Sequence, residues 1–154
     1  MIKPAKILHL CIGPEGTPDL TRQACDEIEL VEGKGIKGDK KFGKSTSRHV
    51  NLITQHSYDW FKASFKRELK APGGFGEQVV VSSELDVNWL PLGTKLQVGE
   101  AVLELAKPRQ PCMHFASSVE APSEELFVGH VGIMCRVLKG GKARVGDAVT
   151  VLKS

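Results

Sequence analysis

Residues 95–105 read Lys-Leu-Gln-Val-Gly-Glu-Ala-Val-Leu-Glu-Leu, and this stretch decides the fold class. Apolar side chains alternate with polar ones before the central Gly-Glu pair and recur with a similar spacing after it, which is typical of half-buried strands. A turn between two such runs predicts an antiparallel hairpin. The pattern therefore indicates a β protein at this point of the chain.

Similar short apolar runs recur along the chain and extend this interpretation. They cover residues 7–12, 28–31, 49–53, 78–81, 133–138 and 148–152. The last two runs are joined through Gly140-Gly141, so we expect them to pair with each other. The sixteen glycines and eight prolines imply many turns. Many short strands favour a mainly β fold, a closed or nearly closed β-barrel, because closure removes unpaired strand edges.

One segment has a helical rather than a strand-like period. Phe61, Phe65 and Leu69 are spaced four residues apart with charged residues on the other faces, which is typical of an amphipathic helix. Thr54 is suited to cap its N-terminus, and a Pro-Gly-Gly run stops it. We therefore expect one substantial α-helix of about four turns, beginning near Thr54 and ending by Ala71.

Length and composition fit one globular domain over residues 1–154. A chain of 154 residues with 41% hydrophobic composition can bury a core without disulfides or metals. A net charge of +3 lacks the basic excess of a dedicated nucleic-acid binder. Because the sequence has no run of about 18 apolar residues and no signal-peptide pattern, we expect no membrane span and a cytoplasmic location. Its four cysteines are then reduced thiols.

The segment Lys107-Pro108-Arg109-Gln110-Pro111-Cys112-Met113-His114-Phe115 carries the most chemistry. Its two prolines stiffen the backbone and keep the segment out of a strand ladder, so Cys112 stands in a rigid loop. Its neighbours Lys107, Arg109 and His114 supply positive charge, which favours the thiolate, the reactive form of cysteine. The alternative is a small buried hydrophobe, the usual role of a lone cysteine.

Two other cysteines, Cys11 and Cys135, lie inside apolar strands. We expect both to be buried and unreactive, because apolar surroundings disfavour the thiolate. A different use of such side chains is a structural zinc site with four ligands, here Cys112, His114, His130 and Cys135. Their spacings match no common zinc pattern, so the sequence argues against this site.

A basic, glycine-rich segment is the second candidate for function. From Lys34 to Arg48 it carries six positive charges against one negative charge, Asp39. It lacks an apolar period, so we expect a surface loop, either a solvated run of charges or a binding site for an anion such as phosphate. The spacing of a P-loop is absent. Glu77, at a loop-to-strand junction, is placed either to accept backbone N–H bonds or to orient a ligand.

Several of these segments resemble the MOSC domain family in order and spacing, over about residues 30–152. The matching stretches are Gly38-Asp39, Arg48, 72–77, 92–93, 98–103, 108–112, 132–138 and 145–147. The Pro-Arg-x-Pro-Cys element after a Gly-Glu-Ala-Val-Leu-Glu strand is the most specific of them. The resemblance implies a β-barrel-type fold and a chain of the small, stand-alone bacterial type.

What the resemblance implies about function concerns Cys112. MOSC domains form the C-terminal part of molybdenum cofactor sulfurases and also occur in amidoxime-reducing enzymes. Cys112 then either ligates the molybdenum of a molybdopterin cofactor, with reduction of N-hydroxylated compounds, or carries a persulfide without small-molecule turnover. Either use implies a sulfur-donor or electron-donor protein as partner. No pyridoxal phosphate is expected, because the chain lacks the desulfurase domain of the eukaryotic sulfurases.

An anionic cofactor needs several donors, and arginine binds phosphate with two parallel hydrogen bonds. We therefore expect a pocket lined by Arg109 and Arg136, with basic residues of the 37–48 segment at its rim. One departure from the family is Glu77-Gln78, where Glu-Asn is common. The complete predicted set is Cys112 for catalysis and molybdenum, and Lys37, Gly38, Asp39, Arg48, Gly76, Glu77, Arg109, His114 and Arg136 for the cofactor.

Overall fold

The computed structural model describes residues 3–18, 20–45 and 47–153. In these residues the strands are β1 (Ala5–Ile12), β2 (Gln23–Cys25), β3 (Glu27–Val31), β4 (Gly35–Ile36), β5 (Val50–Thr54), β6 (Val79–Val81), β7 (Lys95–Val98), β8 (Ala101–Pro108), β9 (Ile133–Lys139), β10 (Gly141–Arg144) and β11 (Ala148–Val151). The helices are α1 (Gln55–Phe65) and α2 (Met113–Ser118), with short 3-10 helices η1 (Val87–Trp89) and η2 (Glu124–Phe127).

The main sheet closes on itself. Its strand order is β11-β7-β8-β9-β5-β6-β1-β2, and β11 also pairs with β1, so all of these strands except β2 form a barrel. The closing register sets Ala5 opposite Val149. Strands β5 and β6 run parallel because α1 lies in the connection between them, and the other neighbours in the barrel are antiparallel. The predicted β-barrel with one substantial helix is confirmed.

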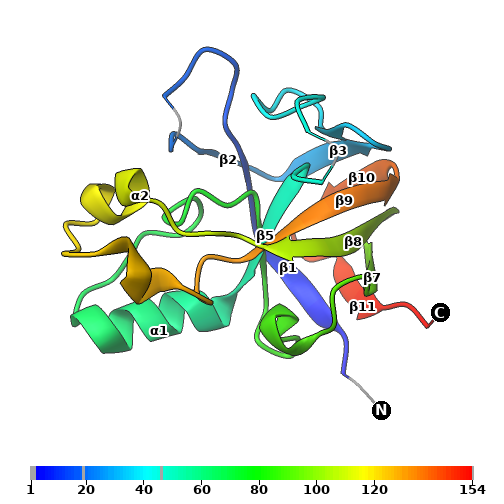
Figure 1. Ribbon diagram of the computed structural model, residues 1–154. Helices are drawn as coiled ribbons and strands as arrows, with labels where there is room; N and C mark the ends of the chain where they lie inside the picture. Colours follow the sequence, from blue (N-terminus) through cyan, green and yellow to red (C-terminus); the bar gives the residue numbers. More distant parts are fainter. Residues whose placement is uncertain (1–2, 19, 46, 154) are drawn as a thin grey trace.

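Two apolar clusters hold the fold together. Alternate residues of β8, such as Leu103 and Leu105, fill the barrel interior. A second cluster lies outside the barrel, where α1, α2 and η2 contribute Phe61, Phe115 and Phe127. Figure 1 shows both helices on one side of the barrel. Because β5 is covered on both faces, all five of its residues are buried.

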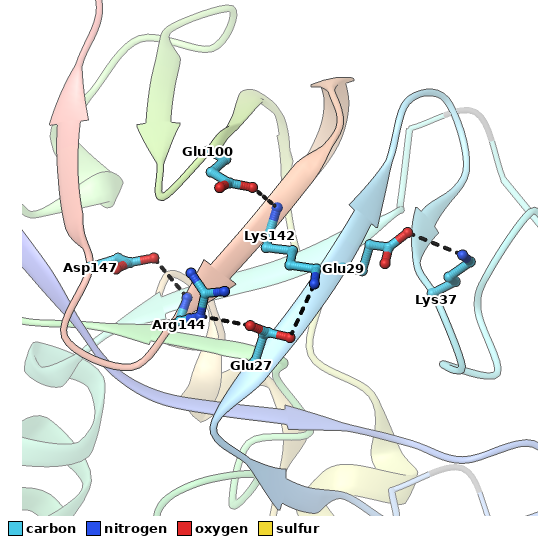
Figure 2. A network of polar contacts seen from close by, with 7 residues as sticks. All are labelled: Glu27, Glu29, Lys37, Glu100, Lys142, Arg144 and Asp147. Carbon is cyan, nitrogen blue, oxygen red and sulfur yellow. Dashed lines mark hydrogen bonds and ion pairs between the residues drawn. The ribbon is translucent and has the colours of Figure 1, made fainter.

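A smaller sheet, β10-β3-β4, lies beside the barrel. Figure 2 shows the charged side chains on its strands. Glu27 of β3 pairs with Arg144 at 2.7 Å and with Lys142 at 3.9 Å, both on β10. Glu29 pairs with Lys37 at 3.1 Å. Exposed pairs of this kind contribute at most about 1 kcal/mol each to stability, so they add little to the stability of the sheet.

The expected pairing of residues 133–138 with residues 148–152 is wrong. Strand β9 pairs with β8 and β5, whereas β11 pairs with β7 and β1. The chain turns at Gly140, and β10 then leaves the barrel to pair with β3. A Cβ on Gly140 would lie 2.7 Å from the Leu30 carbonyl oxygen. The glycine therefore permits the close approach of the β3 backbone that redirects the chain.

Helix α1 begins after Thr54 as predicted, but it has 11 residues and is shorter than four turns. Lys66 ends it in the left-handed conformation, with φ of 59°. Arg67 then donates to the Val119 carbonyl and lies 5.3 Å from the Phe61 ring centroid. The helix therefore ends where these tertiary contacts begin, several residues before Pro72. Within the described part of the chain, no helix is long and apolar enough to cross a membrane.

Candidate functional site

A pocket of about 480 Å³ lies between the end of β8 and the basic segment that precedes β5. Its lining residues are Lys41, Lys44, Ser45, Arg48, Lys107, Pro108, Arg109, Gln110 and Met134. Five of these side chains are cationic, and none of the lining residues is acidic. Fields of one sign in a cleft concentrate ions of the other sign, so the pocket has the chemistry of an anion site.

Arg109 joins this pocket to the loops around it. Its guanidinium donates to the carbonyls of Phe75 and Val131. Burial lowers the pKa of this guanidinium, and electrostatic interactions with Cys112 and Glu77 act in the opposite direction. An arginine nevertheless stays charged in proteins. Arg109 is therefore a fixed positive charge that lines the pocket and interacts with Cys112.

Glu77 is fully buried and organises the loop that receives Arg109. Its Oε2 accepts from the Tyr58 hydroxyl at 2.6 Å and from the Gly73 N–H at 2.9 Å. Its Oε1 accepts from the Phe75 N–H at 3.0 Å, beside the Phe75 carbonyl that accepts from Arg109. Burial and Glu77 raise the pKa of Tyr58, so the phenol keeps its proton. Glu77 thus takes the first of its two predicted roles and lies outside the pocket lining.

Two predicted glycines shape the backbone near the site. Gly76 has φ of 76°, and a Cβ there would lie 3.3 Å from Nη2 of Arg109. Its carbonyl also accepts from Nε of Arg22 at 3.0 Å, so glycine allows two arginines to approach one loop. Gly38, with φ of 86°, turns the chain immediately before Asp39. Both positions favour glycine because L side chains rarely adopt this backbone conformation.

Asp39 anchors the basic segment to the barrel. Its buried Oδ1 accepts from the Gly13 N–H at 2.7 Å, and its Oδ2 accepts from the Lys41 N–H at 3.0 Å. The Gln78 amide also donates to Oδ2, at 3.4 Å, and its oxygen accepts from the Asn51 N–H at 2.8 Å. The longer Gln78 side chain therefore bridges Asp39 and β5. Asp39 positions Lys41 without itself lining the pocket.

A buried histidine holds the other end of the basic segment. Nδ1 of His49 accepts from the Val137 N–H at 3.0 Å, so Nε2 carries the proton and donates to the Ser45 carbonyl at 2.9 Å. Burial lowers the pKa of this ring, which favours the neutral form that the two bonds require. Oγ of Ser45 accepts from the Arg48 N–H at 3.1 Å. No sequence pattern marks His49, because its partners are backbone groups.

Cys112 is exposed and forms the N-cap of α2. Its Sγ accepts from the Phe115 N–H at 3.4 Å. The guanidinium of Arg109 also interacts electrostatically with Cys112. Cys112 is not one of the lining residues, but it follows the lining residue Gln110 by two positions and interacts electrostatically with the lining residue Arg109. Helix α2 is too short to give a periodic signal in the sequence.

Cys11 and Cys135 are fully buried, as predicted. Burial raises the pKa of each thiol to about 12. We expect native thiol labelling to modify Cys112 at least about a hundredfold faster than either, because only the thiolate reacts. Mass spectrometry after brief alkylation checks this rate difference, and the urea-unfolded chain, in which all four cysteines label, is the control. Rapid labelling of Cys135 in the native protein would contradict the assignment.

Three predicted residues lie elsewhere on the surface. Lys37 pairs with Glu29 on the smaller sheet. Arg136 is not a lining residue, because Glu104 stands opposite it in the β8–β9 register and pairs with it at 2.9 Å. His114 is exposed on α2. From the predicted set, Arg48 and Arg109 line the pocket, and Cys112 interacts electrostatically with Arg109. Gly38, Asp39, Gly76 and Glu77 shape the surrounding loops.

The four side chains of the alternative zinc site do not converge. Cys135 lies in the barrel core, whereas Cys112 lies outside it at the start of α2. His130 stacks on the Trp60 ring at a centroid distance of 3.6 Å. In the described ranges, no group of three or more His, Cys, Asp or Glu side chains is placed to hold a metal ion.

The chain resembles known proteins along most of its length. The MOSC domain family matches residues 39–150. A protein named Reductase from Gibberella moniliformis is 27% identical over 161 residues, which cover 99% of this chain and 28% of the relative. The uncharacterized protein YflK of Bacillus subtilis is 27% identical over 127 residues, or 80% of this chain and 56% of YflK. The chain therefore spans between about a quarter and just over half of these relatives.

Solved structures share the fold at low sequence identity. The YuaD protein of Bacillus subtilis has a TM-score of 0.82 at 19% identity, covering 96% of this chain and 94% of YuaD. YiiM of Geobacillus stearothermophilus has a TM-score of 0.73 at 18% identity, covering 97% and 76%. YiiM of Escherichia coli has a TM-score of 0.74 at 20% identity, covering 97% and 70%. Given the barrel, the site and the match over residues 39–150, the chain belongs to the MOSC domain family.

Proposed function

We propose that this chain is a molybdenum-cofactor-linked reductase in which the pocket binds the phosphate of molybdopterin and Cys112 provides a thiolate to molybdenum. One observation carries the proposal: the exposed Cys112 interacts electrostatically with Arg109, one of the five cations that line the pocket. Membership of the MOSC domain family supports this class of cofactor, because these domains are associated with molybdenum cofactor enzymes.

The residues present fit such a group. A phosphate needs several cationic donors and no competing carboxylate, and the lining of the pocket has this composition. A thiolate is a soft ligand suited to transition metals. The volume of about 480 Å³ lies within the usual range of cofactor and ligand pockets.

When bound, the cofactor would supply two-electron redox chemistry for reduction of an N–OH bond. The chain's own residues would bind and orient the cofactor. Arg109, fixed by the carbonyls of Phe75 and Val131, directs its charge toward an anion, and Pro108 and Met134 add an apolar wall to the pocket. The relative named Reductase supports the reductive direction.

Reduction consumes two electrons, so the proposal includes an electron-donor protein as partner. The substrate class is N-hydroxylated compounds. A cytoplasmic location belongs to the same proposal, because the four unpaired cysteines of the structure suit a reducing compartment.

A second candidate function is a persulfide carrier that receives sulfur from a donor protein. It is supported by the exposure of Cys112 and by the neighbouring Met113 on α2, a residue that is 70% exposed. Such a surface lets a protein partner reach the sulfur directly. This function needs no pocket for a cofactor, and the five cations around the pocket therefore favour the first proposal.

Protein made in a host that synthesises the cofactor separates the two functions. The reductase proposal requires molybdenum, measured by elemental mass spectrometry, and the fluorescence of an oxidised pterin in comparable amounts. The carrier proposal requires cyanide-labile sulfur without metal or pterin. Protein that holds none of these would overturn both proposals.

Arg48→Ala is expected to weaken binding of the pterin cofactor by about tenfold or more, because a charge-assisted hydrogen bond contributes about 1.5–3 kcal/mol. Arg48 is exposed at the pocket, so folding should change little. Arg109 is less suitable for this test, because it also holds two loops. The matched control is Lys62→Ala, an exposed cation of α1 that pairs with Glu68. Quenching of pterin fluorescence gives both affinities, and equal losses would indicate general charge alone.

A further inference from the structure

Lys41 differs from the other cations of the basic segment. Its side chain is half-buried and lines the pocket. Among the described residues, its ammonium has no hydrogen-bond or ion-pair partner. The adjacent Lys40 instead donates to the carbonyls of Thr17 and Pro18. Lys41 is therefore a partly desolvated cation directed at the pocket rather than at a protein acceptor.

Three arginines surround Lys41 from three separate segments. Arg22 precedes β2, Arg48 precedes β5 and Arg109 follows β8, and all three repel the ammonium. Asp39, whose Oδ2 accepts from the Lys41 N–H, is the carboxylate that opposes them. Burial is the largest cause, and together these groups lower the pKa of Lys41 to about 8.

The four cations of this cluster do not respond to the repulsion equally. An arginine guanidinium does not lose its proton in proteins, so Lys41 is the group that can relieve the repulsion by releasing one. A dianion in the pocket shifts the protonation equilibrium of Lys41 back toward the charged ammonium, because it attracts that positive charge. Lys44 and Lys107 line the same pocket and add to the positive field.

We propose that Lys41 is an anion-binding residue of the pocket that takes up one proton when a dianion such as a phosphate monoester binds. The inference rests on the proposed function only in that the pocket is an anion site. The sign follows from linkage. The affinity for the dianion is highest at pH values where Lys41 is already protonated in the free protein. It falls as the pH rises through the pKa of Lys41 in the free protein.

Sulfate is the probe, because it keeps both charges across the range studied. Isothermal titration calorimetry in two buffers of different ionisation enthalpy measures affinity and protons exchanged. For the wild type we expect about tenfold weaker binding at about pH 9 than at about pH 7, with close to one proton taken up per sulfate at the higher pH.

Three variants test the role of Lys41. Lys41→Arg keeps a charge that does not titrate. Its sulfate affinity should therefore lack the roughly tenfold fall between about pH 7 and about pH 9, and sulfate binding should take up no proton. Lys41→Gln should bind sulfate weakly at both pH values without proton uptake. The matched control is Lys44→Gln, a rim cation 3.9 Å from Glu15, which should bind more weakly but keep the wild-type proton uptake.

The outcomes separate this inference from the proposed function. Equal pH dependence in the wild type and Lys41→Arg would overturn the role of Lys41, and so would a failure of sulfate to bind. Proton-coupled sulfate binding in protein that never acquires molybdenum would support the inference and overturn the proposed function alone.

Discussion

Replacing Cys112 with serine is expected to reduce turnover of N-hydroxylated substrates at least about a hundredfold, since loss of supporting residues around a metal already costs about 10–100-fold. The serine hydroxyl stays protonated near neutral pH and is a poor ligand for a soft metal. It also cannot form a persulfide, so sulfur loading should be lost if the carrier function operates. Substrate reduction and cyanide-labile sulfur are the two measurements.

The same variant should keep its fold. Cys112 is the N-cap of α2, and serine is among the preferred residues at this position. We expect a stability change below about 1.5 kcal/mol for this near-isosteric replacement, measured by thermal unfolding. The control is Cys25→Ser, a half-buried thiol outside the pocket lining, which should remain active. Full activity of Cys112→Ser would contradict both candidate functions.

Glu77→Ala is expected to lower the free energy of unfolding by roughly 3–5 kcal/mol, because each buried donor left without an acceptor costs about 1–3 kcal/mol. The donors are the Tyr58 hydroxyl and the N–H groups of Gly73 and Phe75. Domains of this size are stable by only about 5–15 kcal/mol. Urea denaturation should therefore show a large fall in the midpoint.

Two variants distinguish the effect of losing the hydrogen bonds to Glu77 from the effect of losing any carboxylate. Tyr58→Phe removes one of the three bonds to Glu77 and should cost about 1–3 kcal/mol. Glu68→Ala removes an exposed carboxylate that pairs with Lys62, and such pairs contribute at most about 1 kcal/mol. A Glu77→Ala variant as stable as Glu68→Ala would contradict the structural role of Glu77.

The parts of the fold that depend on local patterns could be predicted from the sequence. The alternation in residues 95–105 gives the β7–β8 hairpin, in which Leu96 stands opposite Leu103. Strands within apolar runs bury their cysteines, so the burial of Cys11 and Cys135 followed from their neighbours. In both cases the physical cause lies within a few residues of the observed effect.

The parts that depend on distant segments could not be predicted. Whether Arg136 lines the pocket is decided by Glu104 on the next strand, which is 32 residues away in sequence. The partners of β9 and β11 are set by the closure of the barrel and by the departure of β10. The surroundings of Lys41 come from three arginines on separate segments. Such contacts leave no period or motif in the chain.

The most direct test of the proposed site is X-ray absorption at the molybdenum edge of holo-protein with selenocysteine in place of Cys112. Selenium scatters more strongly than sulfur, so a direct bond to molybdenum is distinguishable from the sulfurs of the pterin. We expect selenium in the first coordination shell of molybdenum, because the exposed Cys112 interacts electrostatically with Arg109 of the cationic pocket. A first shell without selenium, in protein that carries molybdenum, would contradict this assignment.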